Sequence, residues 1–108
     1  LYVSYIGKRE DNCYDLKIIS TELNKEYLNF QIFYETSNCV NVENSHGFYP
    51  AQGAGGRIVK LDNSNILFTT GDFRNRPLAQ NLKSDFGKIL KINTKSRKAK
   101  VISLGHTA

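Results

Sequence analysis

Apolar and polar residues alternate along much of this chain, and that period of two constrains the fold more than any other feature. In LNFQIFYE (28–35), Leu28, Phe30, Ile32 and Tyr34 share one face, and polar side chains share the other. Such a pattern predicts a half-buried strand. No segment keeps convincing helical spacing over three turns. The alternation therefore predicts an all-β protein built from antiparallel strands.

Three hairpins are expected from the turns that separate the apolar runs. The polar segment 21–26 joins one pair of strands, and DNSN (62–65) favours a tight turn in the next pair. Short strands joined by turns are typical of a sandwich, a barrel or the blades of a propeller. The basic segment KSRKAK (95–100) is expected at the tip of the third hairpin. The expected strands cover residues 1–6, 14–20, 28–35, 57–61, 66–71, 87–93 and 99–104.

The length of the chain suits about two antiparallel four-stranded blades, because one propeller blade takes roughly 40 to 50 residues. We expect an incomplete blade of three strands over 1–38, a connecting loop over 39–56 and a second blade of four strands over 57–108. The sequence begins at Leu1 and not at Met, so we expect a fragment of a longer polypeptide whose targeting signal is missing.

The net charge of +5 does not by itself indicate a nucleic-acid-binding protein. Much of it lies in Lys95, Arg97, Lys98 and Lys100, which are expected to form a solvated hairpin tip. No aromatic residues are interleaved with these charges, as binding to single strands would require. No apolar run approaches the roughly 20 residues that span a membrane. We therefore expect neither a nucleic acid partner nor a membrane span.

The glycine-rich stretch GAGGRIVKL (53–61) resembles a phosphate cradle at first sight. A nucleotide-binding loop of that kind runs into a helix, whereas the residues that follow here are β-branched, short and end at a turn. We therefore expect Gly55 and Gly56, together with Gly71 of TTGD, to be structural glycines. They would let the backbone bend where a side chain would collide with its neighbours.

Five short motifs occur in a definite order between residues 53 and 106: GGRIV, ILFTTGD, NRPLAQNL, FGKILKIN and SLGH. This order resembles the soluble sugar dehydrogenases that use pyrroloquinoline quinone (PQQ), the glucose/sorbosone dehydrogenase family. The resemblance implies a six-bladed β-propeller with its active-site loops at one end of the central channel. It also implies that PQQ and calcium bind to the complete protein, whereas we expect no cofactor and no metal in this segment.

The resemblance places functional residues at defined positions of this sequence. The family's catalytic histidine, four residues before the arginine of GGR, corresponds to Gly53, and the aspartate that orients it corresponds to Asp72. An Arg-Asn pair that contacts the cofactor follows LGH in the family, where this chain has Thr107 and Ala108. The resemblance therefore implies a chain that is not catalytic as given.

Two histidines and Asp72 have alternative interpretations. His46 lies seven residues before Gly53 and is the candidate replacement base; the alternative is an exposed loop histidine. Asp72 is either an acid/base partner or a turn residue after a strand. His106 is interpreted as a structural histidine at a strand end.

Cys13 and Cys39 form an even pair without metal-ligand spacing. They bracket the first hairpin, whose antiparallel strands would bring its open ends together, so we expect a disulfide. Closing that loop would stabilise the fold by about 3 kcal/mol in the chain-entropy model. A disulfide indicates a periplasmic or secreted setting.

Three functions remain open at this point. The chain is part of an oxidoreductase completed by other segments, a non-catalytic propeller that binds sugar or protein, or a stand-alone β-sandwich binding module. In the first two cases its partners are the remaining propeller blades or further copies of itself, with a sugar as the candidate ligand.

Overall fold

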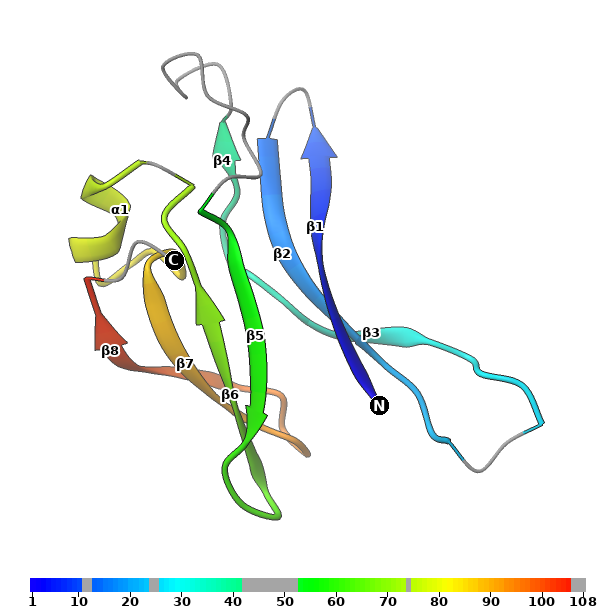
Figure 1. The fold of residues 1–108 in the computed structure, drawn as a ribbon. Coiled ribbons are helices and arrows are strands. Elements are labelled where there is room, and N and C mark those ends of the chain that lie inside the picture. The colour runs from blue at the N-terminus through cyan, green and yellow to red at the C-terminus, as the bar shows by residue number, and fades with distance from the viewer. Residues whose placement is uncertain (11–12, 24–25, 42–52, 74, 106–108) are drawn as a thin grey trace.

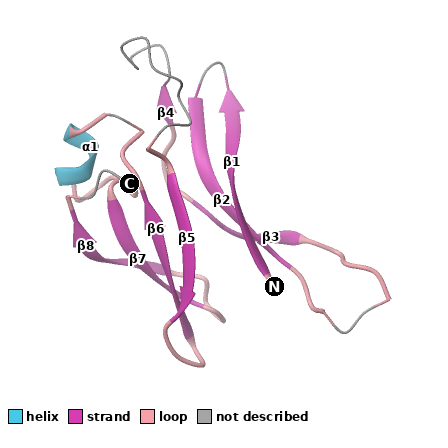
Figure 2. Cartoon of the chain, viewed as in Figure 1, coloured by secondary structure: helices cyan, strands magenta, loops and turns pink. Residues whose placement is uncertain are grey.

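The computed structural model describes residues 1–10, 13–23, 26–41, 53–73 and 75–105. Over these residues the chain forms two antiparallel four-stranded sheets whose inner faces share one apolar core (Figure 1). The predicted all-β class and the predicted four-stranded antiparallel sheets are confirmed. The single helix among the described residues is α1 (Pro77–Gln80), one turn that begins with a proline (Figure 2).

The first sheet consists of β1 (Tyr2–Glu10), β2 (Cys13–Ser20), β3 (Gln31–Glu35) and β4 (Val40–Asn41). Its order is β1-β2-β3, and β4 also pairs with β2, through Cys13 and Tyr14. β3 and β4 therefore pair with two successive segments of β2 along the same edge. β4 is a strand that the sequence analysis did not foresee, and it lies within the stretch expected to be a connecting loop.

The second sheet is a simple meander of β5 (Gly55–Lys60), β6 (Asn65–Thr70), β7 (Lys88–Asn93) and β8 (Ala99–Leu104). The β5–β6 turn is stabilised by Asp62, whose carboxylate accepts the Ser64 N–H at 2.7 Å. That hydrogen bond is the main reason why the pKa of Asp62 is lowered. The side chains at the β7–β8 tip are exposed, as expected for a solvated hairpin.

The core forms where the alternating residues of both sheets meet. Phe68 on β6 and Leu90 on β7 are directly opposite in register and fully buried. Leu16 and Ile18 supply the matching side chains from β2, and Tyr34 packs edge-on against Phe68 with ring centroids 6.4 Å apart. Each such side chain stabilises the fold by about 1.5 to 3 kcal/mol when buried. The shared core holds the two sheets together.

The predicted strand over 28–35 is wrong in its start and in its faces. The strand begins at Gln31, and the β2–β3 register shifts so that Ile18 faces Tyr34 while Ile19 faces Ile32. Phe33 is therefore the extra residue of a β-bulge, and such a bulge breaks the period of two. As a result Phe33 is 5% exposed and enters the core, whereas Ile32 is 45% exposed on the outside.

Candidate functional site

Asp72 lies just beyond the end of β6, in a loop that is closed in by two other segments. It is 1% exposed, and its backbone carbonyl accepts the Asn75 N–H at 2.8 Å. The residues on either side of it, Gly71 and Phe73, carry the backbone contacts to those segments. Its backbone position is thus set by both neighbours along the chain.

Gly53 is one of the residues against which this loop rests. The Phe73 N–H donates to the Gly53 carbonyl at 3.2 Å, and the Gly71 N–H donates to the Ala54 carbonyl at 2.7 Å. Positions 53 and 72 therefore lie side by side, although they are 19 positions apart in sequence. Gly53 has a φ of 73°, in the left-handed region that favours glycine.

Gly55 makes this close approach possible. Its φ is +76°, and a Cβ added to it would lie 2.7 Å from the Gly71 nitrogen and 3.0 Å from the Thr70 carbonyl carbon. Both of these atoms belong to backbone that cannot move away easily. Gly71 in turn accepts the Gly87 N–H at its carbonyl, at 2.9 Å.

The second segment against Asp72 is the loop 84–87 that leads into β7. The Thr70 hydroxyl donates to the Asp85 carbonyl at 2.5 Å. The Phe86 ring packs edge-on against the Phe73 ring with centroids 5.1 Å apart. The loop after β6 and the loop before β7 are therefore held together on both sides of Asp72.

Asp85 ties this loop to the first sheet. Its Oδ2 accepts the Ser37 N–H at 2.6 Å and the Tyr34 hydroxyl at 3.0 Å. Asn38 adds two further bonds, because its Oδ1 accepts the Asp85 N–H at 3.2 Å and its Nδ2 donates to the Ser84 hydroxyl at 3.3 Å. Burial raises the pKa of Tyr34 far above its usual range, and the Asp85 carboxylate adds to that shift.

Lys88 is a buried cation that the sequence analysis missed. Its Nζ donates to the carbonyls of Leu78 and Phe86, at 2.8 and 2.7 Å. Burial lowers the pKa of Lys88, while the negative charge of Asp85 opposes that shift. The signal was present in the alternation, since Lys88 takes the same face of β7 as the buried Leu90.

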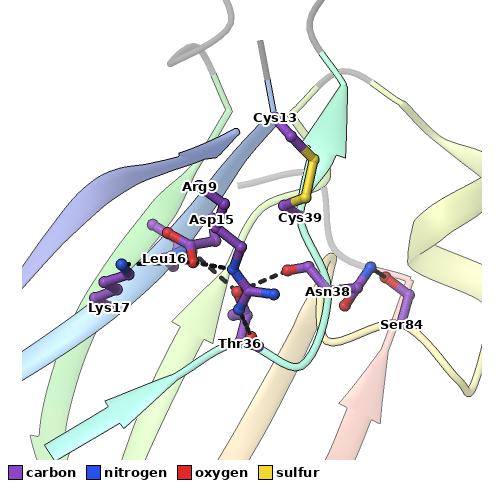
Figure 3. Close-up of a disulfide and its surroundings, with 9 residues drawn as sticks. All are labelled: Arg9, Cys13, Asp15, Leu16, Lys17, Thr36, Asn38, Cys39 and Ser84. Atoms are coloured by element: carbon purple, nitrogen blue, oxygen red, sulfur yellow. Dashed lines mark hydrogen bonds and ion pairs between the residues drawn. A yellow bond between two sulfur atoms is a disulfide. The ribbon is translucent and has the colours of Figure 1, made fainter. Parts of the chain in front are cut away.

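The predicted disulfide between Cys13 and Cys39 is confirmed, with the two Cα atoms 5.5 Å apart (Figure 3). The disulfide closes the corner between β3 and β4, residues 36–39. Ser37 and Asn38 of this corner make the hydrogen bonds to Asp85. Thr36 fixes the same corner, because its hydroxyl donates to the Asn38 carbonyl at 2.9 Å.

An ion pair between the exposed Arg9 and the buried Asp15 lies beside the disulfide (Figure 3). The Arg9 Nε donates to the Asp15 carboxylate at 2.5 Å, and Asp15 is fully buried. A second guanidinium nitrogen of Arg9 donates to the Thr36 carbonyl. Arg9 therefore connects β1, β2 and the corner after β3.

The structure does not describe four of the predicted site residues. His46, His106, Thr107 and Ala108 lie outside the described residues. The structure thus brings together Gly53 and Asp72, and it adds Asp85 and Lys88. No pattern of spacing along the chain marks Asp85, because its partners lie 48 and 51 residues away.

The described residues near Asp72 offer no cluster of side chains for the calcium ion that the resemblance implies. No group of three or more His, Cys, Asp or Glu side chains within the described part of the chain could hold a metal ion. Lys88 is a buried cation in this region, but it is already bonded to two backbone carbonyls.

Comparison with known proteins identifies the family. The model of the family described as Glucose / Sorbosone dehydrogenase matches residues 1–102, so the match includes the first sheet as well as the first four of the five motifs after residue 53. Neither the search of curated proteins nor that of solved structures gave a match. None of the helices described is long and apolar enough to cross a membrane. Because the family match spans nearly the whole sequence, the chain belongs to the glucose/sorbosone dehydrogenase family.

Proposed function

We propose that this chain supplies two neighbouring blades of a six-bladed propeller of the glucose/sorbosone dehydrogenase type. The loops around Asp72 face the substrate end of the channel. The two sheets are the blades, and the core between them is the contact that adjacent blades make. Apolar side chains on the outer faces, such as the exposed Val3, Ile32 and Val59, favour this arrangement over a closed sandwich, which would leave no apolar face open.

In this proposal the chain does not itself oxidise sugar. The observation that supports this point is the hydrogen bond from the Phe73 N–H to the Gly53 carbonyl, because it holds Gly53 next to the loop of Asp72. The resemblance assigns the family's base to position 53. Abstraction of a hydroxyl proton by a positioned base contributes about 10²–10⁴ in rate, and glycine has no side chain to provide it. Asp72 then acts as a loop residue or as a hydrogen-bond acceptor for a sugar.

The remaining parts of the function lie outside this chain. PQQ and calcium would be held by residues of other blades, because an anionic quinone is best bound by guanidinium groups and the position of the family's arginine is Thr107. The partners are the remaining blades or further copies of the chain. The disulfide supports a periplasmic or secreted location.

A second candidate is a non-catalytic propeller that binds sugar or protein through these loops. Glycine at position 53 favours it, since loss of the base does not affect binding. The two candidates differ in whether the assembled protein oxidises a sugar.

The test is calorimetric titration of the chain with PQQ in the presence of calcium, followed by a dye-reduction assay with several aldoses. We expect no micromolar binding and no turnover. Measurable turnover would overturn the proposal, and its loss in His46→Ala would identify His46 as the replacement base. Turnover that survives His46→Ala would point to a base elsewhere in the chain.

A further inference from the structure

A groove of about 470 Å³ lies between the two sheets at the end of the molecule away from Asp72. We call it the Arg97 groove. The strand registers fix its place, since Tyr2 pairs with Ser20 at one end of the first sheet. Figure 1 shows the start of β1 and the β7–β8 turn near the lower end, with α1 at the upper end. The residues that line the groove include Ser20, Glu22, Asn29, Gln31, Phe33, Thr94 and Arg97.

Arg97 is held in the groove at a cost in backbone strain. Its φ is 61°, in the left-handed region, and its N–H donates to the Asn93 carbonyl across the hairpin turn at 2.7 Å. Glycine or asparagine usually takes this position in such turns. A strained residue that persists is a reason to look for a role of its side chain.

The Arg97 side chain crosses to the first sheet and leaves most of its donors available. Its Nη1 donates to the Ile32 carbonyl at 3.0 Å, and its Cζ lies 5.2 Å from the centre of the Phe33 ring. Nε and Nη2 have no hydrogen-bond partner among the described residues. A guanidinium fixed on one side presents a planar fork on the other, which matches the two oxygens of a carboxylate.

The charges around the groove favour an anion. Lys95 and Lys98 flank Arg97 in the same turn, and Glu22 is the acidic residue that borders the groove. No ion pair links Glu22 to Arg97 within the described part of the chain. An unneutralised guanidinium with basic neighbours raises the local concentration of anions.

The remaining polar side chains suit hydroxyl groups. Asn29 and Gln31 each offer a carbonyl oxygen and an NH₂ group, Ser20 offers a hydroxyl, and Glu22 accepts hydrogen bonds. Neighbouring hydroxyls of a sugar ring both donate and accept, so they need such a mixed set. The volume lies within the roughly 300 to 1,000 Å³ usual for small-molecule sites.

We propose that the Arg97 groove binds a saccharide unit that carries a carboxylate, that is, a uronic acid. Arg97 donates hydrogen bonds to the carboxylate, and Asn29 and Gln31 bind ring hydroxyls. The site is separate from the loops around Gly53 and Asp72, so it does not depend on the function proposed for them.

The experiment is a nuclear magnetic resonance titration of the full 108-residue chain with D-glucuronate, D-glucose and acetate. We expect saturable shifts at the Arg97 Nε–H and at the amides of Gln31 and Thr94 with glucuronate. Binding of glucose or acetate alone should be at least about tenfold weaker, since each lacks one half of the recognised group. If acetate binds as tightly as glucuronate, the groove is a simple anion site and the proposal is overturned. The absence of a shift with all three probes would also overturn it.

Arg97→Gly is the decisive variant, because glycine adopts the left-handed backbone without strain and should keep the turn. We expect it to weaken glucuronate binding at least about tenfold. Arg97→Lys keeps the charge but not the fork and should also bind more weakly. Lys95→Gln removes the same charge outside the groove and should bind as the unchanged chain does. If Arg97→Gly fails to fold, Gln31→Ala replaces it, and unchanged binding in the variant used would refute the proposal.

Discussion

Asp85 and Tyr34 belong to different sheets, and the carboxylate of Asp85 accepts the hydroxyl of Tyr34 at 3.0 Å. The same carboxylate oxygen accepts the Ser37 N–H at 2.6 Å. The loop that borders Asp72 is thereby held by the first sheet and not only by its own strand neighbours. The stability of the two sheets is therefore coupled through one acidic side chain.

Replacement of Asp85 by alanine should lower the free energy of unfolding by about 2 to 4 kcal/mol, because hydrogen bonds to a charged group contribute about 1.5 to 3 kcal/mol each. Urea denaturation measures this loss. Lys83→Ala, at an exposed position immediately before this loop, is the control and should change stability by no more than about 0.5 kcal/mol. An equal effect of the two substitutions would refute the role given to Asp85.

Tyr34 should make the fold sensitive to alkali. Burial and the Asp85 charge raise its pKa in the folded state, so the folded protein keeps the phenol proton where the unfolded chain loses it. Its contribution is complete below the ordinary tyrosine pKa of about 10 and falls progressively as the pH rises above it. The difference in unfolding free energy between the unchanged chain and Tyr34→Phe should shrink above that pH. A difference that stays constant to higher pH would contradict this account.

Removal of the disulfide in Cys13→Ala/Cys39→Ala should cost about 3 kcal/mol of stability. It should also speed hydrogen exchange at the amides of Ser37 and Asp85, because both bonds involve the corner that the disulfide closes. The amide of Leu90, in the centre of the second sheet, serves as the reference. Exchange that rises equally at all three amides would indicate global destabilisation without a special effect on the corner.

Gly55→Ala should be strongly destabilising, by about 2 kcal/mol or more, because it combines a left-handed backbone with a clash against the Gly71 and Thr70 backbone. Gly105→Ala is the matched comparison. It shares a positive φ of +87°, but its Cβ would meet only the end of the Gln80 side chain. Thermal unfolding should therefore show a clearly smaller loss for Gly105→Ala.

The isolated chain should associate in solution. Val3 on β1 and Ile32 on β3 are exposed, and both are paired with Ile19 of β2, so they form an apolar row on the outer face of the first sheet. Contiguous apolar surface of this kind promotes association. Light scattering at tens of micromolar should detect oligomers, and Val3→Lys should reduce them. A sharp monomer peak for the unchanged chain would disprove the expectation.

The second sheet could be predicted well from the sequence because its signals are local. Asp62 marks the β5–β6 turn through a bond two residues along the chain, and the alternating residues of β6 and β7 reach the core as their spacing suggests. The disulfide could also be predicted from the sequence, since hairpin geometry alone brings Cys13 and Cys39 together. Local chemistry therefore accounts for these parts.

The rest could not be predicted because it depends on distant contacts. The bulge at Phe33 places Phe33 in the core and Ile32 on the surface, the reverse of the predicted arrangement. The alternation along the chain is compatible with either of these two residues in the core. Asp85 has no local signature, because its hydrogen-bond partners come from the other sheet. The approach of Gly53 to Asp72 was implied by the family resemblance, and only the fold supplies the backbone bonds that produce it.

The disulfide also determines what happens when the chain is cut. Cys13 and Cys39 enclose β2, β3 and the exposed connection between Ser20 and Gln31, which includes Leu23 and Tyr27 at the surface. A protease that cleaves within this connection leaves both pieces covalently joined. Such a nicked molecule migrates as one species on a gel without reductant and separates into two only when a thiol is added.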